Sequence, residues 1–318
     1  MKTTSCLCTF FVLLLITSCQ NKTPSENQSA TNTTSTEEPT VKQTSTNDYN
    51  LYLPAQAEQV LILFPGGGTV AKDIEANFDI VTPAPKEKVA LLLMNFNRHL
   101  WITPEDCASI TSIIEQALKE NQLEGLPIVL GGMSIGGTVA VTLGNYWMTQ
   151  KLAYQPAGVF IVDSPIDLYA LYENASFDTK RTDLDEQRLG EPRWIVDYFA
   201  SSFGTEKEEL LTNIQQVSPL TYATKHWDNI AQLQEVPVRF YTEPDPEWWK
   251  VNRKTEHERT NAYFLKQWST FLQEKGWAKL ELIETKNKGY RASGERHPHS
   301  WSIVAVPELL QWMKTLSK

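Results

Sequence analysis

The most informative segment of this chain is Pro127-Ile128-Val129-Leu130-Gly131-Gly132-Met133-Ser134-Ile135-Gly136. A short apolar run leads directly into a match to the pattern G-x-S-x-G, and a segment rich in Ala, Val and Leu follows. This order predicts a buried strand, a sharp turn at Ser134 and a helix over 134–148. A serine on such a turn has a strained backbone, and a Cβ on either flanking glycine would crowd it. The alternative is a glycine-rich turn in which Ser134 merely caps the helix.

Five more short apolar runs flank this stretch. They are continuous rather than alternating, as in strands that a parallel sheet buries on both faces. Helical patterns separate them, one beginning at the N-cap Thr103 with Pro104 behind it, and others over 255–275 and 307–316. Alternating strands and helices predict an α/β fold with a mostly parallel central sheet and flanking helices. The six strands are expected over 60–64, 89–96, 127–130, 157–162, 236–241 and 278–283.

Residues 167–234 break this alternation. They hold amphipathic segments rich in acids and aromatics, over 194–203 and 206–217, and no clear strand. We therefore expect a helical cap inserted over one end of the sheet.

The N-terminus has the pattern of a targeting signal. Met1-Lys2 precede an apolar stretch over 7–16, which is too short to span a membrane but has the length of a signal-peptide core. Small residues then lead into Cys19, an arrangement that resembles a bacterial lipobox. The resemblance implies a lipoprotein signal peptide over 1–18 and a lipid anchor on Cys19, which would hold the protein to a membrane of the bacterial cell envelope, periplasmic or surface-facing. The alternative is a plain secretory signal in which Cys19 is incidental.

The segment after Cys19 is almost entirely polar. Only Ala30 and Val41 are apolar between residues 20 and 48, so we expect a flexible tether over 19–48 and a folded domain over 49–318. Since only Tyr49 to Leu53 precede the first buried strand, an antiparallel edge hairpin is expected to be short or missing.

Charge and cysteine content narrow the function. The net charge is −9 over 318 residues, which argues against a nucleic-acid partner and against electrostatic adhesion to anionic lipid. Four cysteines are present. After the two in the signal peptide and Cys19, only Cys107 remains, so the domain has no internal disulfide and Cys107 is expected to be a buried, inert thiol.

The turn around Ser134, in its strand-to-helix context, resembles that of the α/β-hydrolase superfamily. The resemblance implies that Ser134 is a nucleophile and that the N–H of Ile135 is an oxyanion donor. A second donor would come from the loop after the first buried strand, often His-Gly-Gly-Gly in that superfamily. Here the loop is Pro65-Gly66-Gly67-Gly68; because Pro65 lacks an N–H, we expect the donor at Gly67 rather than Gly66. A phosphate-binding loop is disfavoured, since no Gly-Lys-Ser/Thr follows.

The general base must titrate near neutral pH, which favours histidine. His297 and His299 follow the last strand and precede the last helix, where the superfamily keeps its base. We expect His299 to be that base, because it lies nearer the helix and Pro298 stiffens its approach. His297 is the alternative. A metal site at this pair is disfavoured, because neither a His-Glu-x-x-His motif nor a cysteine partner is present.

The acid of the triad is expected beyond the fifth buried strand. Glu243-Pro244-Asp245-Pro246 forms a stiff loop there, and we expect Asp245 to orient the imidazole. Glu243 and Asp163 are the alternatives. Asp163 follows the fourth strand and is interpreted more simply as a turn or cap residue.

These residues predict acyl transfer to Ser134 and then to water, without a metal or an organic cofactor. A carboxylic ester is the expected substrate. The alternatives are a serine peptidase or amidase of the same fold, and a catalytically inactive binding lipoprotein. Five large side chains are expected near the site, where they would stack on a sugar or a flat acyl group or else pack within the insertion: Arg98, Trp101, Trp248, Trp249 and Trp301.

Overall fold

The computed structural model describes residues 40–96 and 99–316. The expected signal peptide, Cys19 and all but the last residues of the expected tether lie outside this part of the chain. Within it, no helix is long and apolar enough to cross a membrane.

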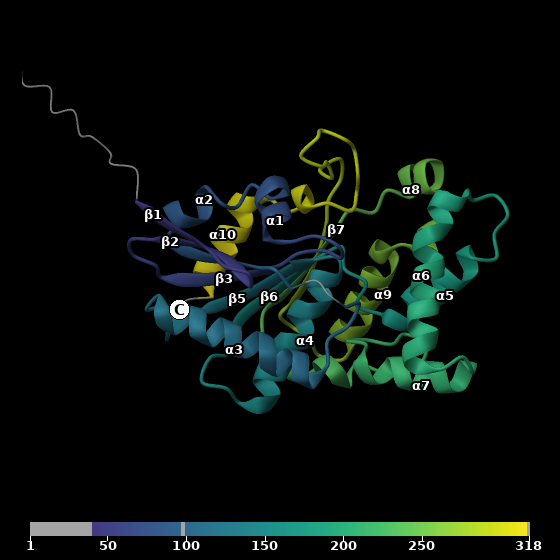
Figure 1. Cartoon of the computed structure of the whole chain (residues 1–318), viewed down its shortest axis with the longest axis horizontal. Coiled ribbons are helices and arrows are strands. Elements are labelled where there is room, and N and C mark those ends of the chain that lie inside the picture. The colour runs from purple at the N-terminus through teal and green to yellow at the C-terminus, as the bar shows by residue number, and fades with distance from the viewer. Residues whose placement is uncertain (1–39, 97–98, 317–318) are drawn as a thin grey trace, which may run out of the picture. The chain divides into compact units, whose positions relative to one another are not determined.

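A single eight-stranded sheet forms the centre of the described domain, with the strand order β1-β2-β4-β3-β5-β6-β7-β8 (Figure 1). The strands from β3 to β8 pair in parallel, and all six of the expected strands are present. β8, at the sheet edge, is only partly buried and is not the fully buried strand that was expected. The strands are β1 (Val41–Ser45), β2 (Tyr49–Pro54), β3 (Gln59–Phe64), β4 (Val89–Met94), β5 (Ile128–Met133), β6 (Pro156–Val162), β7 (Val238–Thr242) and β8 (Leu280–Glu284).

The edge hairpin, which was expected to be short or missing, is present with strands of five and six residues. β1 pairs antiparallel with β2, which in turn pairs antiparallel with β4. β1 lies within the range that was expected to be a tether. The side chains of β1 are mostly polar and mostly exposed, so the sequence of this strand looks like that of a tether. Its pairing depends on backbone hydrogen bonds at a sheet edge, which leave little trace in hydrophobic patterning.

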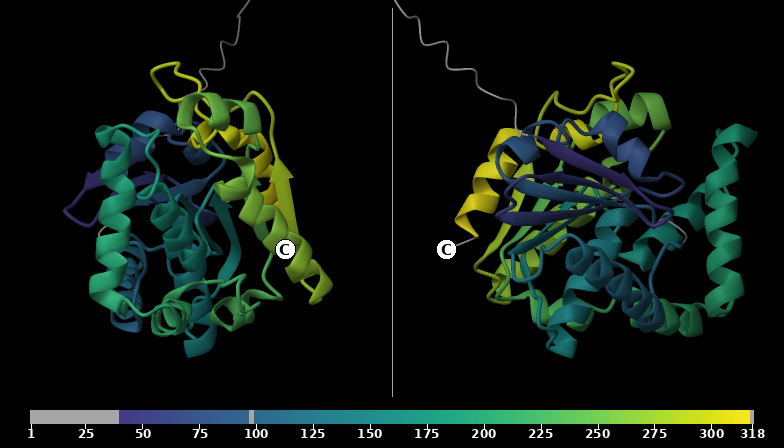
Figure 2. Two further views of the ribbon diagram at one scale, coloured as in Figure 1. Left: turned by 90° about the vertical axis from the view of Figure 1, so that its right-hand side faces the viewer. Right: turned by 60° about the vertical axis from the view of Figure 1, so that its left-hand side comes forward.

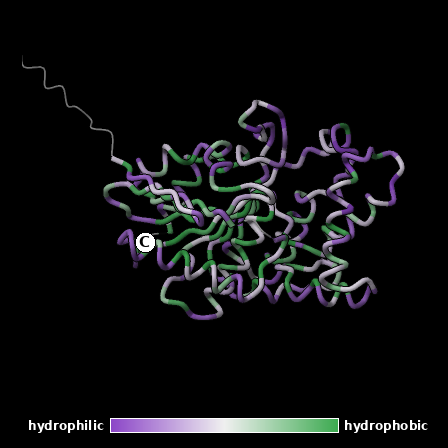
Figure 3. The backbone as a smooth tube through the Cα atoms, in the orientation of Figure 1, coloured by the Kyte–Doolittle hydropathy of each residue, from purple (hydrophilic) through white to green (hydrophobic). Residues whose placement is uncertain are grey.

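Helices cover both faces of the sheet. α3 (Pro104–Glu120), α4 (Ile135–Gln150) and α9 (Asn261–Glu274) pack on one face. α1 (Ala71–Asn77), α2 (Pro83–Lys86) and α10 (Val306–Thr315) pack on the other. The apolar residues concentrate along the strands between these layers (Figure 3).

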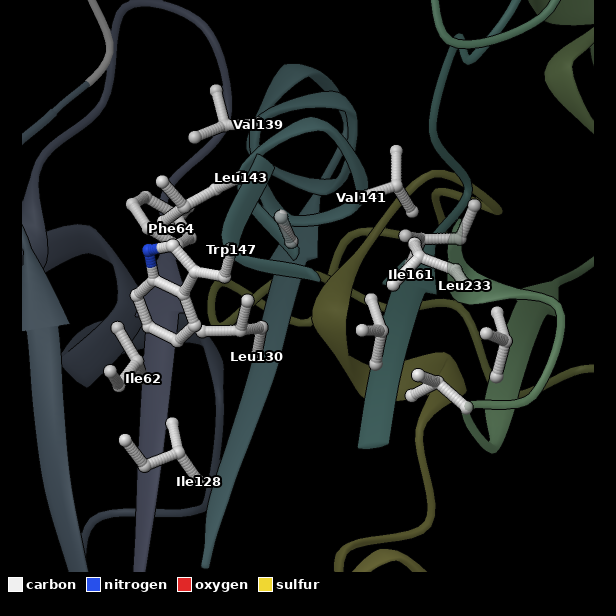
Figure 4. Packing of buried hydrophobic residues seen from close by; sticks show 14 of the residues in the cluster. Ile62, Phe64, Ile128, Leu130, Val139, Val141, Leu143, Trp147, Ile161 and Leu233 are labelled. Carbon is white, nitrogen blue, oxygen red and sulfur yellow. The ribbon is translucent and has the colours of Figure 1, made fainter. Parts of the chain in front are cut away.

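Alternate residues of a strand belong to opposite layers. Ile62 and Phe64 of β3 lie in the cluster with α4, whereas Leu61 and Leu63 lie in the cluster with α10. Trp147 of α4 is fully buried against the first of these groups (Figure 4). Its indole N–H donates to the Thr111 hydroxyl at 2.7 Å. This packing anchors α4, and with it the turn at the start of that helix.

Four helical segments separate β6 from β7: α5 (Leu168–Asp178), α6 (Glu186–Phe203), α7 (Lys207–Val217) and the 3-10 helix η1 (Asp228–Leu233). The first three have a hydrophobic cluster of their own, which includes Phe199 and also Ile135. These three helices lie beyond one end of the sheet (Figures 1 and 2). The expected helical cap is therefore present, and it packs on the residue that follows Ser134.

The helix expected over 255–275 is shorter in the structure. α8 (Pro246–Arg253) and the 3-10 helix η2 (His257–Arg259) precede it, and α9 begins only after Thr260. The Thr260 side chain caps α9 by accepting from the Tyr263 amide. A further 3-10 helix, η3 (Trp301–Ile303), precedes α10.

Candidate active site

Ser134 lies at a strained turn between β5 and α4. Its backbone has φ 54° and ψ −130°, which places it among the positive-φ residues that are uncommon outside glycine. A Cβ on Gly132 would lie 2.1 Å from the Gly136 carbonyl oxygen, and a Cβ on Gly136 would lie 2.3 Å from that of Phe64. Both glycines of the motif are therefore required by the close approach of the backbone. The Ser134 side chain forms no capping hydrogen bond to α4 among the described residues, which disfavours the alternative of a serine that merely caps the helix.

The turn opens onto a cavity of about 790 Å³. Ser134, Ile135, His297 and His299 are among the residues that line it. Ile135 is the first residue of α4, so its N–H is one of the helix donors without an acceptor in the preceding turn. A helix N-terminus also carries partial positive charge, which favours an anion at this place.

The glycine loop after β3 lies against the same turn. A Cβ on Gly66 would lie 3.5 Å from the Ser134 Cβ, and one on Gly67 would lie 3.9 Å from the Ile135 side chain. The Thr69 hydroxyl and amide both donate to the Gly66 carbonyl, which closes the loop. The structure thus brings the expected oxyanion residues together with Ser134.

His299 pairs with Asp163. Its Nδ1 lies 2.7 Å from the Asp163 Oδ2, and the other carboxylate oxygen accepts from the Thr242 hydroxyl, also at 2.7 Å. The Asp163 side chain is only 5% exposed, whereas that of His299 is 24% exposed. With Nδ1 as the donor to Asp163, Nε2 of His299 is the nitrogen that can accept a proton.

Asp163 is held in place by its backbone as well as by its side chain. It follows β6 directly and has φ 45°. Its N–H donates to the Tyr241 carbonyl, and its own carbonyl accepts from the Asn261 side chain at 2.7 Å. The simpler interpretation of Asp163 as a turn or cap residue was wrong about its carboxylate.

Asp245 does not occupy the place expected for it. Its carboxylate accepts from the Trp248 amide as the N-cap of α8 and pairs with Arg296 at 2.6 Å. Pro246 at the first helical position explains this, because it makes Asp245 the capping residue. The carboxylate that reaches the imidazole comes instead from the end of the neighbouring strand β6, at Asp163.

Glu243 holds the histidine loop instead of contacting His299. This carboxylate is 1% exposed and accepts from the amides of Lys288 and Gly289. It also pairs with Arg296 at 2.5 Å, and Arg296 donates to the Gly289 carbonyl. Sequence reasoning missed Arg296, whose position directly before His297 was the available signal.

His297 is a buried neighbour of His299, with 6.2 Å between the ring centroids. Its Nε2 accepts from the Arg253 guanidinium at 3.1 Å, and its Nδ1 is buried without a partner in the described part of the chain. Burial, with the cationic Arg291 next in importance, lowers the pKa of His297 to about 3. A neutral ring without a carboxylate partner does not have the surroundings of a triad base.

The expected aromatic residues separate into two groups. Trp101 packs on Tyr198 of the cap, and Trp301 stacks on Phe78 at 4.7 Å, so both are packing residues. Trp249 lines the cavity and Trp248 packs against His297. Arg98 lies outside the described residues.

Cys107 is the free thiol that the sequence predicts. It is buried, and burial raises its pKa to about 12, so it is not a reactive thiolate near neutral pH.

No family model matches the chain, and no curated protein matches it. Solved structures of esterases do. Carboxyl esterase 2 from the mycorrhizal fungus Tuber melanosporum superposes with a TM-score of 0.51 at 15% identity, over 89% of this chain and 88% of that one. The HSL-homolog EstE7 from a metagenome library superposes with a TM-score of 0.52 at 16% identity, over 88% and 87%. The chain therefore has the α/β-hydrolase fold of these esterases.

Proposed function

We propose that the chain is a serine hydrolase that cleaves carboxylic esters through an acyl-enzyme on Ser134. The observation that carries the proposal is the partly buried Asp163–His299 hydrogen bond beside a cavity that both His299 and Ser134 line. A carboxylate on Nδ1 fixes the tautomer in which Nε2 accepts a proton, and that is the arrangement that activates a serine.

The reaction has two halves. The Ser134 Oγ attacks the ester carbonyl carbon while His299 Nε2 takes the hydroxyl proton, and His299 then returns this proton to the departing alcohol. A water molecule, deprotonated by the same nitrogen, attacks the acyl-enzyme and releases the acid and the serine. The amides of Ile135 and Gly67 would receive the oxyanion of each tetrahedral intermediate. Asp163 would orient His299 and stabilise its cation.

Two other functions remain in competition. A peptidase or amidase would use the same triad, and an inactive binding lipoprotein would use the cavity alone. Esters are favoured over amides because the solved structures with this fold include esterases. The paired and partly exposed His299 favours catalysis over binding, since a binding protein gains nothing from such a dyad.

The test compares p-nitrophenyl butyrate with butyryl p-nitroanilide, which differ only in the ester or amide linkage. We expect hydrolysis of the ester with a much higher kcat/KM than the anilide. Ser134→Ala should abolish this hydrolysis. Ser201→Ala removes an exposed hydroxyl on α6 that donates to the Tyr198 carbonyl of its own helix, so this control should keep the hydrolysis. Faster anilide cleavage would favour the amidase, and a folded protein inactive on both would contradict catalysis.

We also propose that the protein is a bacterial lipoprotein, anchored through Cys19 to a membrane of the cell envelope. The sequence pattern around Cys19 supports this.

A further inference from the structure

The cavity at Ser134 contains arginines that no carboxylate neutralises. Arg253 and Arg259 both line it. Within the described residues, neither forms an ion pair. The partners of Arg253 are the His297 ring nitrogen at 3.1 Å and the face of Trp248. The partners of Arg259 are the Asn174 amide oxygen and the ring of Phe177, 3.3 Å from the guanidinium carbon. Trp248, Asn174 and Phe177 have no charge, and burial lowers the pKa of His297, so this ring is also neutral at pH 7.

Both arginines are linked to the catalytic groups through a neighbouring residue. Arg253 contacts His297, whose ring centroid is 6.2 Å from that of His299. Arg259 precedes Thr260-Asn261, and the Asn261 side chain donates to the backbone of Asp163. The last residue of α8 and the last residue of η2 therefore each add a positive charge to the cavity that His299 also lines.

The acids that line the cavity are mostly engaged elsewhere. Asp167 accepts from the Ala170 and Tyr222 amides, and Asp178 pairs with Arg181. Asp185 caps α6 and lies 3.8 Å from Arg188. Neither Asp167 nor Glu191, which is exposed on α6, forms an ion pair among the described residues. Arg291 adds a further cation, 4.0 Å from Glu295.

An unpaired guanidinium in a cavity has a high affinity for oxyanions, because its planar fork matches a carboxylate or phosphate and its charge has no internal partner. We infer that Arg253 and Arg259 bind a carboxylate or phosphate group carried by the substrate, so that the preferred ester is itself an anion. This inference deepens the proposed function, since it names the substrate class of the same site.

The test uses pairs of esters that differ in charge but not in shape. The purified full chain is assayed with monomethyl adipate and with its neutral counterpart, methyl 6-amino-6-oxohexanoate, by titrating the acid released. The monomethyl esters of shorter and longer linear dicarboxylic acids, each with its amide counterpart, cover other depths of the cavity. We expect kcat/KM for the best anionic ester to exceed that for its neutral partner by tenfold or more.

Substitutions assign the preference to the arginines. Arg253→Gln and Arg259→Gln should each lower the ratio of anionic to neutral kcat/KM by about ten- to a hundredfold, as expected for a lost charged hydrogen bond. Arg253→Lys keeps the charge and should lower it less. Arg193→Gln is the matched control, because Arg193 is an exposed arginine of α6 outside the cavity lining and pairs with Glu186; it should leave the ratio unchanged.

Binding measurements separate this inference from the proposed reaction. Titration calorimetry of the Ser134→Ala chain with adipate, adipamide and inorganic phosphate needs no turnover. Binding of adipate or phosphate that is lost with Arg253→Gln supports the inference even if no ester is hydrolysed, and it identifies which anion is preferred. The inference is overturned if the anionic and neutral esters of a pair are turned over equally. It is also overturned if Arg193→Gln changes the preference for the anionic ester as much as the cavity variants do.

Discussion

At the level of single residues, the proposed reaction depends on which carboxylate orients His299. Asp163 lies 2.7 Å from the imidazole, and Asp245 caps a helix instead. The two acids therefore form a matched pair for mutagenesis, since the same change should have a chemical effect at one and a structural effect at the other.

Asp163→Asn should lower kcat for ester hydrolysis by about 10³- to 10⁴-fold, because an amide stabilises the wrong tautomer and cannot stabilise the imidazolium. Asp245→Asn should reduce kcat far less, and should cost about 1 kcal/mol of stability at most, because Asn also caps helices well. Steady-state kinetics and urea unfolding of both variants check this. Equal losses of kcat in the two would contradict the assignment of Asp163.

Burial of His297 should make the free energy of unfolding depend on pH. Its pKa is about 3 in the folded chain, against 6.5 for an unperturbed histidine, so between these values the unfolded chain binds a proton that the folded chain does not. The free energy of unfolding should thus fall as pH drops below about 6.5. The free energy of unfolding of the His297→Gln variant should fall less steeply over the same pH range. Urea titrations at several pH values measure this for both proteins. Parallel curves for the two proteins would show that His297 is not the group responsible.

At the scale of elements, the β5–α4 turn requires both glycines. Gly136→Ala places a Cβ 2.3 Å from the Phe64 carbonyl oxygen, whereas Gly190→Ala on α6 meets nothing within 4 Å. The first change should destabilise the fold by several kcal/mol or prevent folding. The second should stabilise it by about 0.5–1 kcal/mol, because alanine is the better helix former. Thermal unfolding of the two variants measures the difference, and a well-folded Gly136→Ala protein would contradict this account of the turn.

The elements that hydrophobic patterning specifies could be predicted, and those held by polar contacts could not. The six expected strands and the turn at Ser134 are present, although the edge strand β8 is only partly buried. β1 was missed because an edge strand of polar residues resembles a tether. The acid was assigned one strand away from its position, because a carboxylate that caps a helix and one that orients an imidazole both follow strands. The two carboxylates are distinguished by the pairing of β6 with β7, which brings the Thr242 hydroxyl within hydrogen-bond distance of Asp163.

The loop before α10 is also held by polar contacts that the sequence pattern does not predict. Its position depends on Glu243, whose hydrogen bonds to Lys288 and Gly289 span more than forty residues of sequence. Such long-range contacts have no local signature, so the sequence placed His299 in the right loop but could not show what holds that loop.

At the scale of the whole molecule, the proposal of a lipid anchor predicts where the protein is found. In a bacterial host the wild-type chain should fractionate with membranes, and its mature N-terminus should be a lipid-modified Cys19. Cys19→Ser should remove the modification and leave the protein unprocessed or released. Cys6→Ser, a cysteine within the expected signal, is the control and should change neither result. Fractionation and N-terminal mass spectrometry measure both, and a mature chain with an unmodified Cys19 would contradict the anchor.

The central claim is that Ser134 is a nucleophile activated by His299 and Asp163. Its most direct test is to treat the full chain with a fluorophosphonate probe and to locate the adduct by peptide mass spectrometry. We expect one phosphonylated residue, Ser134, with labelling lost in Ser134→Ala, strongly slowed in Asp163→Asn and retained in Ser201→Ala. A folded chain that is not labelled, or one labelled on another residue, would contradict the account.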